Sequence, residues 1–379
     1  MNPDSYTTTM ALLPTCSRGL DGPDITDETF QLFIEGDDLY NAMLAAIRKA
    51  QHSVQLESYI FADDNIGQVF ARALVDKARQ GITVKVHLDA AGSLFWVSRR
   101  LENMMRHDGV QLRWFHRWSW RNPWRYNRRN HRKLLIVDEE TAFLGGFNIH
   151  KESSRRNFGE ARWRDSHVRV GGQLSQIASQ LFEAFWEGSL HWSPVSAGSG
   201  DQLLHNHSRN CNHRLRCVYI DALKRAERYI YITTPYLVPD QLILSQLYHA
   251  ASRGVEVFLL VPEKSDVPIA RWAAQSIYAG LFSSGVRVFE YLPRMLHAKT
   301  IVVDDGWSMV GTANLDYRSL FHNYELNLVS TSPNLATNLK AQFLVDLAES
   351  AEIGQQQWKK RGLATRSLER FARLFRYWL

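Results

Sequence analysis

Hydrophobic and polar residues follow two different periods along this chain, and the same succession of periods occurs twice. Residues 46–60 begin as the end of an amphipathic helix and continue as a β-rich strand, and residues 222–236 repeat this order without a gap. Residues 77–89 and 250–262 each contain a helix end, a glycine where a helix C-cap is expected, and another strand. The pattern predicts that both halves of the chain alternate helices and strands.

The strands predicted in each half are short, apolar and unbroken. A third matching pair, 108–115 and 284–291, adds one more strand to each half. Strands of this kind are typical of a buried, mostly parallel sheet covered by helices. We therefore expect an α/β fold of two lobes related by internal duplication, with mostly parallel sheets and ligands bound in the crevice at the strand ends.

A short polar motif opens a further strand in each half. Both copies read H-x-K-x4-D, they lie 166 residues apart, and each is followed by an asparagine 17 residues after its histidine. The matched spacing predicts one active site assembled from two half-sites. The candidate site residues are His131, Lys133, Asp138 and Asn148 in the first copy, and His297, Lys299, Asp304 and Asn314 in the second.

These residue types suit transfer of a phosphate ester. Positions i and i+2 of a strand face the same side, so the histidine and lysine of each copy should project together. Two ammonium groups would bind a phosphate, and the asparagine amides would stabilise charge in the transition state. One neutral histidine would attack phosphorus and form a phosphohistidine, while the other would protonate the leaving alcohol. No metal or other cofactor is expected, because lysine and asparagine supply the electrostatics.

Each histidine also needs a carboxylate on its far ring nitrogen to fix the tautomer and stabilise the cation. Asp165 and Glu325 follow the histidines of their own halves, His131 and His297, by 34 and 28 residues. Each carboxylate opens a strand-like run, so both are candidate orienting groups. The alternative is an ordinary charge at the edge of a strand.

Further blocks accompany the repeated motif: GDDLYNAMLAAIRKA, LESYIFADDNIG, LDAAGS, WRDSHVRV and GTANLDYRSLFHNYELN. With the motif they resemble the paired signature of the phospholipase D superfamily over about residues 31–345. Within it the chain is most similar to bacterial cardiolipin synthases, in the short form that lacks two N-terminal transmembrane helices.

The resemblance implies two phospholipase D-like α-β-α lobes with pseudo-two-fold symmetry and one active site between them. It implies transfer of a phosphatidyl group, from phosphatidylglycerol or phosphatidylethanolamine, onto the hydroxyl of phosphatidylglycerol. It also implies that His131 is the nucleophile, that His297 is the general acid, and that Asp138 and Asp304 are structural.

The duplication and the composition together divide the chain into five regions, with a linker rich in Ser, Gly and His between the lobes. They are an N-terminal extension, 1–30; a first lobe, 31–190; the linker, 191–214; a second lobe, 215–345; and a basic amphipathic C-terminal tail, 346–379.

Charge and aromatic content predict a membrane partner. The net charge of +6 favours an anionic partner, and the twelve Trp suit a membrane headgroup region. The 116–130 segment interleaves Arg with Trp118, Trp120 and Trp124, and 358–379 reads as a basic amphipathic helix. No 18-residue apolar run and no signal peptide are found in the sequence, and its three cysteines form no disulfide framework. We therefore expect a peripheral enzyme on the cytoplasmic side of the cell membrane, bound to anionic phospholipid.

Several alternatives remain open at this stage. The same fold could act as a hydrolytic phospholipase D, as a nucleic-acid phosphodiesterase, although no nucleic acid is expected as a partner, or as a non-enzymatic membrane-binding module. The Arg/Trp segment could be a solvated loop, and the tail could dock on the protein's own surface. The His and Cys residues of 205–217 could suggest zinc, but their spacing fits no standard set of zinc ligands.

Overall fold

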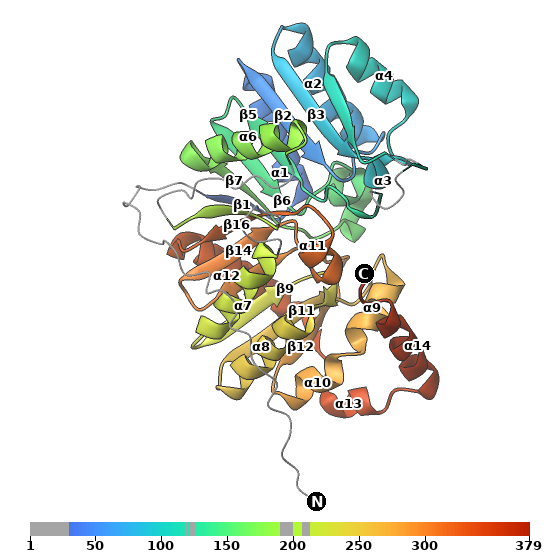
Figure 1. Cartoon of the computed structure of the whole chain (residues 1–379), viewed down its shortest axis with the longest axis vertical. Coiled ribbons are helices and arrows are strands. Elements are labelled where there is room, and N and C mark those ends of the chain that lie inside the picture. The colour runs from blue at the N-terminus through green and yellow to red at the C-terminus, as the bar shows by residue number, and fades with distance from the viewer. Residues whose placement is uncertain (1–29, 118–119, 122–125, 190–199, 207–212) are drawn as a thin grey trace, which may run out of the picture.

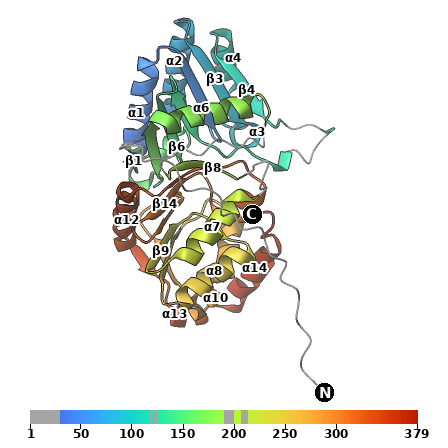
Figure 2. The same ribbon diagram turned by 60° about the vertical axis from the view of Figure 1, so that its left-hand side comes forward.

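The computed structural model describes residues 30–117, 120–121, 126–189, 200–206 and 213–379. Over these residues the chain forms two α/β lobes stacked along its long axis (Figure 1). One apolar core lies between the first-lobe sheet and helices α1, α2 and α4, and another lies within the second lobe. A further core contains residues of both lobes, including Leu144 and Leu328. The two lobes are therefore packed together through continuous buried apolar contacts, and Figure 2 shows the same stacking from a second direction.

The first lobe has a seven-stranded sheet in the order β1-β7-β6-β5-β2-β3-β4. Its strands are β1 (Gln31–Phe33), β2 (Ser53–Ser58), β3 (Thr83–Asp89), β4 (Gln111–Phe115), β5 (Leu134–Val137), β6 (Thr141–Gly145) and β7 (His167–Gly171). Its helices are α1 (Gly36–Lys49), α2 (Asn65–Arg79), α3 (Ala90–Ser93), α4 (Arg99–His107), α5 (Arg155–Phe158) and α6 (Gly172–Trp186), with 3-10 turns η2 (Lys151–Ser153) and η3 (Gly159–Ala161).

The second lobe has an eight-stranded sheet in the order β17-β12-β11-β9-β13-β14-β16-β8 and a small pair, β10 with β15. Its strands are β8 (Gln202–His205), β9 (Tyr229–Thr233), β10 (Leu237–Val238), β11 (Glu256–Pro262), β12 (Arg287–Tyr291), β13 (Thr300–Val303), β14 (Trp307–Gly311), β15 (Leu315–Asp316), β16 (Leu326–Ser330) and β17 (Ser350–Glu352). Its helices are α7 (Arg214–Arg225), α8 (Gln241–Ser252), α9 (Pro268–Gln275), α10 (Tyr278–Ser283), α11 (Tyr317–Phe321), α12 (Pro333–Ala348), α13 (Gln355–Lys359) and α14 (Leu363–Leu374).

The predicted α/β fold with two duplicated lobes is confirmed, but the expectation of mostly parallel sheets is wrong. Strands β2, β3 and β4 are parallel, as are β9, β11 and β12, because a helix connects each strand to the next. In the two main sheets, the strands from the histidine motif onward pair antiparallel. A three-residue turn joins β5 to β6, with φ of 54° at Asp138 and 59° at Glu139, and so short a connection can only make a hairpin.

Two strands of the second-lobe sheet lie in regions that were predicted to be linker or tail. Strand β8 falls inside the predicted linker, 191–214, and pairs with β16 in the second-lobe sheet. Strand β17 falls inside the predicted tail, 346–379, and pairs with β12. The rest of the linker, at 190–199 and 207–212, and the N-terminal extension before residue 30 lie outside the described residues.

The tail ends in helix α14, which packs along α9 on the side of the second lobe (Figure 1). Ala372 of α14 is buried against Val238 and Ala273, and Leu379 packs against the same cluster. Among the described residues, no helix is both long and apolar enough to cross a bilayer.

Candidate active site

The two H-x-K segments approach each other where the lobes meet. Each lies directly before an antiparallel strand, β5 or β13, that runs beside the carboxyl end of a parallel strand, β2 or β9. His131 and His297 line one cavity of about 270 Å³, together with Asn148 and Asn314. The structure therefore brings the histidine and the asparagine of both predicted half-sites to a single cavity, which we call the catalytic cavity.

Two short backbone bridges hold the lobes together at this cavity. The His131 N–H donates to the carbonyl of Tyr324 (2.9 Å), and the Tyr324 N–H donates to that of Arg129 (2.8 Å). In the symmetry-related bridge, the His297 N–H donates to the carbonyl of Arg164 (2.7 Å). Each histidine is thus fixed by the backbone of the opposite lobe.

The carboxylates pair with the histidines across the lobes. The Nδ1 atom of His131 lies 2.9 Å from Oε2 of Glu325, and Nδ1 of His297 lies 2.6 Å from Oδ2 of Asp165. Spacing along the chain associates each carboxylate with the histidine of its own half, whereas the structure pairs each with the other histidine. The reason is that both carboxylates follow the bridging residues, so they face the motif of the opposite lobe. Nδ1 is occupied in both histidines, which leaves Nε2 for chemistry.

The two carboxylates have different surroundings. Glu325 accepts hydrogen bonds from Thr312 Oγ1 (2.5 Å), Ser319 Oγ (2.8 Å) and Asn323 Nδ2 (3.3 Å). Asp165 accepts instead from the backbone N–H of Ser166 (2.8 Å). The residue equivalent to Thr312 in the first lobe is Gly146, where a Cβ atom would lie 2.0 Å from Asp165 Oδ1. Glycine is required at this position by the close approach of the carboxylate.

Thr312, Ser319 and Asn323 were not among the residues singled out from the sequence. They lie in the block GTANLDYRSLFHNYELN, and only Asn314 and Glu325 of that block carried an evident chemical reason. Their contacts with Glu325 depend on the turn through β15 and α11, which the spacing of residues does not show.

Both lysines are buried beside the histidines. Lys133 Nζ donates to the carbonyl of His131 (2.8 Å), and Lys299 Nζ donates to that of His297 and lies 3.9 Å from Asp165 Oδ2. Burial, followed by the charge of Lys299, lowers the pKa of Lys133 to about 7. Burial also lowers the pKa of Lys299 to about 8. Because the charge of Lys299 acts on Lys133, an anion bound nearby would be stabilised by both lysines.

Burial disfavours the charged form of both histidines in the free site. Burial lowers the pKa of His131 to about 4, even though Glu325 favours the charged form. Burial and then the charge of Lys299 lower the pKa of His297. A phosphate anion in the catalytic cavity would oppose both effects, because it favours positive charge nearby.

The two asparagines lie on the wall of the catalytic cavity. Asn148 Oδ1 accepts from the N–H of Ile60 (3.1 Å), which fixes the orientation of its amide. The backbone N–H of Asn314 donates to Ser319 Oγ (3.1 Å), so the same hydroxyl supports both Asn314 and Glu325. The two asparagines thus border the catalytic cavity, one from each lobe.

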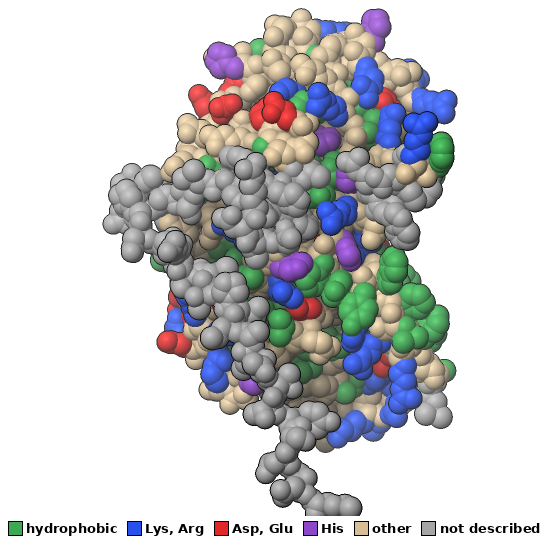
Figure 3. Space-filling view, in the orientation of Figure 1, with side chains coloured by type: hydrophobic (Ala, Val, Ile, Leu, Met, Phe, Trp, Pro, Cys, Tyr) green, Lys and Arg blue, Asp and Glu red, His purple; other side chains and the backbone are tan. Residues whose placement is uncertain are grey.

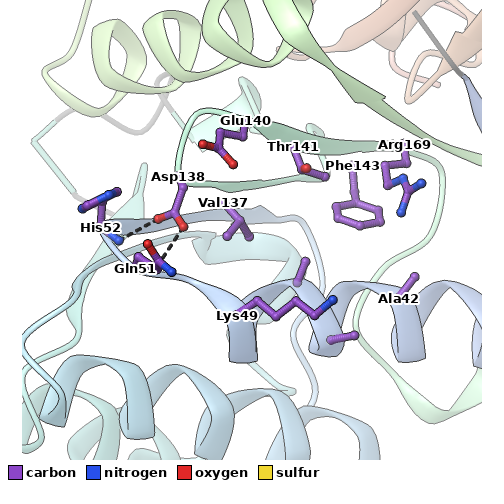
Figure 4. Close-up of a pocket in the computed structure, with 12 residues that line it drawn as sticks. Ala42, Lys49, Gln51, His52, Val137, Asp138, Glu140, Thr141, Phe143 and Arg169 are labelled. Carbon is purple, nitrogen blue, oxygen red and sulfur yellow. Dashed lines mark hydrogen bonds between the residues drawn. The ribbon is translucent and has the colours of Figure 1, made fainter.

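Asp138 and Asp304 do not reach the catalytic cavity. Asp138 lies at the far end of β5, where its carboxylate accepts from the N–H groups of Gln51 (2.8 Å) and His52 (2.7 Å), as Figure 4 shows. Asp304 accepts in the same way from the N–H groups at the start of β9. Both carboxylates fix the entry of a central strand and are placed away from the chemistry.

This placement predicts that Asp138→Ala lowers stability more than catalysis. Loss of the three hydrogen bonds from the N–H groups of Gln51, His52 and Ser53 should cost roughly 2 kcal/mol of unfolding free energy at this partly exposed turn. Urea denaturation would measure the loss, and kcat of the folded fraction should stay within about threefold of wild type. Glu140→Ala, in the same turn, is the matched control and should change neither quantity. An Asp138→Ala protein with normal stability but without activity would contradict the structural role of Asp138.

The end of the tail forms part of the cavity wall, which the sequence did not predict. Trp378 and Leu379 line the catalytic cavity with Arg318. The Arg318 N–H donates to the carbonyl of Leu379 (2.9 Å), and its guanidinium donates to the carbonyl of Asn127 in the first lobe (2.9 Å). The tail is thus docked on the protein's own surface along its inner face, and its last residues contact the site.

The Arg/Trp segment and the residues considered for zinc lie only partly among the described residues. In the Arg/Trp segment, Trp120 is exposed with the Arg121 guanidinium 5.3 Å from its ring centre, while Trp118 and Trp124 lie outside the described residues. Of the residues considered for zinc, Cys211 and His207 also lie outside them. In the part of the chain that the structure describes, no group of three or more His, Cys, Asp or Glu side chains is arranged to hold a metal ion.

Comparison with known proteins places this arrangement in a family. The family model described as "Cardiolipin synthase, PLD-like domain" matches residues 43–186 and 219–347, one segment in each lobe. The chain is 33% identical over 367 residues to the probable cardiolipin synthase YwiE of Bacillus subtilis, covering 92% of this chain and 72% of that protein. It is 31% identical over 350 residues to a cardiolipin synthase of Staphylococcus aureus, covering 89% and 71%.

Solved structures show the same fold at low sequence identity. A phosphatidylserine synthase of Haemophilus influenzae aligns with a TM-score of 0.71 at 12% identity, covering 92% of this chain and 95% of that one. A polyphosphate kinase of Porphyromonas gingivalis aligns with a TM-score of 0.62 at 17% identity, covering 90% and 52%. With two duplicated lobes, a family match in each of them and relatives above 30% identity, this chain belongs to the cardiolipin synthase family of phospholipase D-like phosphatidyltransferases.

Proposed function

We propose that this phosphatidyltransferase moves a phosphatidyl group onto the hydroxyl of phosphatidylglycerol through a phosphohistidine on His131. The observation that carries the proposal is the catalytic cavity, in which each of two histidines is oriented by a carboxylate from the opposite lobe. With phosphatidylglycerol as donor, the products are cardiolipin and glycerol. With phosphatidylethanolamine as donor, the leaving group is ethanolamine.

The reaction proceeds in two balanced steps. In the first, Nε2 of His131 bonds to phosphorus, the bond from phosphorus to the leaving alcohol oxygen breaks, and His297 gives its proton to that oxygen. In the second, the hydroxyl of phosphatidylglycerol gives its proton back to His297 and attacks phosphorus, and the bond from phosphorus to His131 breaks. Lys133 and Lys299 hold the phosphate oxygens throughout.

The different surroundings of the two carboxylates support His131 as the nucleophile. Glu325 shares its charge among three side-chain donors, so it stabilises an imidazolium less than a carboxylate without them would. His131 is therefore kept neutral, as a nucleophile must be. Asp165 lies closer to its histidine, and His297 is its one side-chain hydrogen-bond partner among the described contacts, with Lys299 Nζ 3.9 Å away as an ion pair; this suits a general acid.

We further propose that the enzyme acts as a peripheral protein on an anionic phospholipid membrane, at its cytoplasmic face, without a nucleic-acid partner. Its substrates have two long acyl chains and remain in the bilayer, so the catalytic cavity must be brought to the lipid surface. The basic tail beside the cavity supports this placement.

The direct test is product analysis with purified protein. Vesicles containing radiolabelled phosphatidylglycerol, with and without phosphatidylethanolamine, should yield cardiolipin, and EDTA should leave the rate unchanged. Labelled phosphatidic acid as the main product would show a hydrolytic phospholipase D instead. Loss of activity in EDTA, restored by one divalent ion, would overturn the metal-free mechanism.

A further inference from the structure

We propose that an anionic phospholipid bilayer docks on two exposed apolar protrusions, one from each lobe, on either side of the catalytic cavity. One is residues 94–96 in the first lobe, and the other is the outer face of α14 with the turn that follows it. The inference rests on the proposed function only in that the lipid substrate must reach the cavity from the bilayer.

The first protrusion is Leu94, Phe95 and Trp96, after the short helix α3. All three side chains are exposed, and that of Phe95 is 91% exposed. The loop is tied to the cavity wall, because Ser93 Oγ donates to the carbonyl of Tyr59 (2.8 Å) and the Asp63 N–H donates to that of Trp96 (2.7 Å). Since Tyr59 lines the catalytic cavity, the loop is a fixed extension of its rim.

The second protrusion is the outer face of α14. Its inner face packs against the second lobe through Ala372. Glu369 is the one acidic residue of α14, and its side chain is buried and paired with Arg361. The exposed residues recur at a spacing of three or four and continue to the cavity wall. They are Leu368, Phe371, Leu374, Phe375 and Trp378.

Positively charged side chains lie beside both protrusions. Arg99 and Arg100 follow the first, and Arg370 and Arg373 lie on α14; all four side chains are exposed. Figure 3 shows Lys and Arg side chains beside the apolar patch on the side of α9 and α14. In Figures 1 and 2, α3, the C-terminus and α14 lie along the same side of the molecule. Arginine attracts anionic headgroups, and aromatic side chains insert at the level of the headgroups.

A bilayer fits this surface better than a protein does. One protrusion adjoins the cavity wall at Tyr59 and the other at Trp378, so a protein that covered both would hinder the access of a lipid substrate to the catalytic cavity. A bilayer that covers them delivers phosphate headgroups to it. The most exposed residue of each protrusion, Phe95 in the first and Leu374 in the second, is an apolar side chain within an apolar patch, as expected of a surface that contacts lipid.

Point substitutions test this surface better than deletion of the tail does, because Trp378 and Leu379 form part of the cavity wall. The variant is Phe95→Ser with Leu374→Ser, which removes one apolar side chain from each protrusion. The matched control is Leu344→Ser with Val345→Ser, two exposed positions on α12, which lies on the opposite side of the second lobe from α14.

The measurement is cosedimentation of each protein with vesicles of phosphatidylglycerol and phosphatidylcholine. We expect the double variant to partition about tenfold less than wild type or weaker still, each single variant to fall between, and the control to match wild type. Activity on vesicles should fall with partition, and far more than activity on a dispersed short-chain phosphatidylglycerol. High salt should weaken wild-type binding in part, because screening removes the arginine contribution but not insertion.

Unchanged vesicle binding by the double variant would overturn the proposal. So would light scattering that shows a wild-type dimer without lipid and a monomeric double variant, since the surface would then belong to a second copy of the chain. Binding is read without turnover, so the two proposals can fail separately. Suppose that the wild-type protein makes no cardiolipin, but the double variant still binds vesicles more weakly than wild type. This outcome would support the docking surface and refute the proposed reaction.

Discussion

His131→Ala and His297→Ala should each reduce phosphatidyl transfer from vesicles by about four orders of magnitude or more. Water cannot replace the nucleophile or the proton donor, because both are buried histidines, each held by a carboxylate. The double variant should be within about tenfold of either single variant, because both histidines belong to one active site. Labelled cardiolipin formation, measured at equal concentrations of folded protein, gives the three rates.

A matched control for this series is His249→Ala, an exposed histidine on α8, which should retain wild-type turnover. Near-normal activity in one of the two single variants would contradict a single shared site. Losses that multiply in the double variant would contradict the mechanism in another way, since they would show that the two histidines contribute independently and do not act as a unit.

Removing the charge of a carboxylate should give the second-largest effect. Glu325→Gln should reduce turnover by about 10³-fold to 10⁴-fold, as expected when a histidine loses the anion that fixes its tautomer. Asp165→Asn should cost a similar factor. Glu187→Gln, an exposed glutamate just after α6, is the control for loss of a carboxylate and should be neutral.

The cross-lobe pairing makes these two variants distinguishable. With a p-nitrophenyl phosphodiester, whose leaving group needs no proton, Asp165→Asn disturbs only the general acid and should still release a burst of p-nitrophenolate. Glu325→Gln disturbs the nucleophile and should release none. The reverse result would contradict the combination of cross-lobe pairing with His131 as nucleophile: either His297 is the nucleophile, or each carboxylate serves the histidine of its own half.

Much of the active site follows from the duplication alone. A motif repeated at matched spacing in a duplicated fold must occupy equivalent positions, and this brings His131 and His297 together with their lysines and asparagines. The duplication does not predict contacts that depend on how the two lobes face each other. The partner of each histidine, the donors to Glu325 and the position of Trp378 in the cavity wall are contacts of this kind.

The errors in the fold prediction have a local cause. Apolar runs such as 134–137 and 300–303 look the same whether a strand is parallel or antiparallel, because both kinds are buried on two faces in this fold. Only the short turn after each run decides the direction, and its three residues contain Asp138 or Asp304 with positive φ. The loop at 94–96 was overlooked for a different reason: exposure of three apolar residues is not visible in a pattern that otherwise predicts burial.

The most direct test of the central claim is to identify the covalent intermediate. His297→Ala, mixed with an alkyl p-nitrophenyl phosphodiester, should release about one p-nitrophenolate per chain and then stop, because no group remains to activate the acceptor. Mass spectrometry of the trapped protein should place an acid-labile alkyl phosphoramidate adduct, with its P–N bond to the imidazole, on His131, and His131→Ala should show neither burst nor adduct. An adduct on His297 in the His131→Ala protein, or steady turnover without an adduct in either variant, would contradict the mechanism.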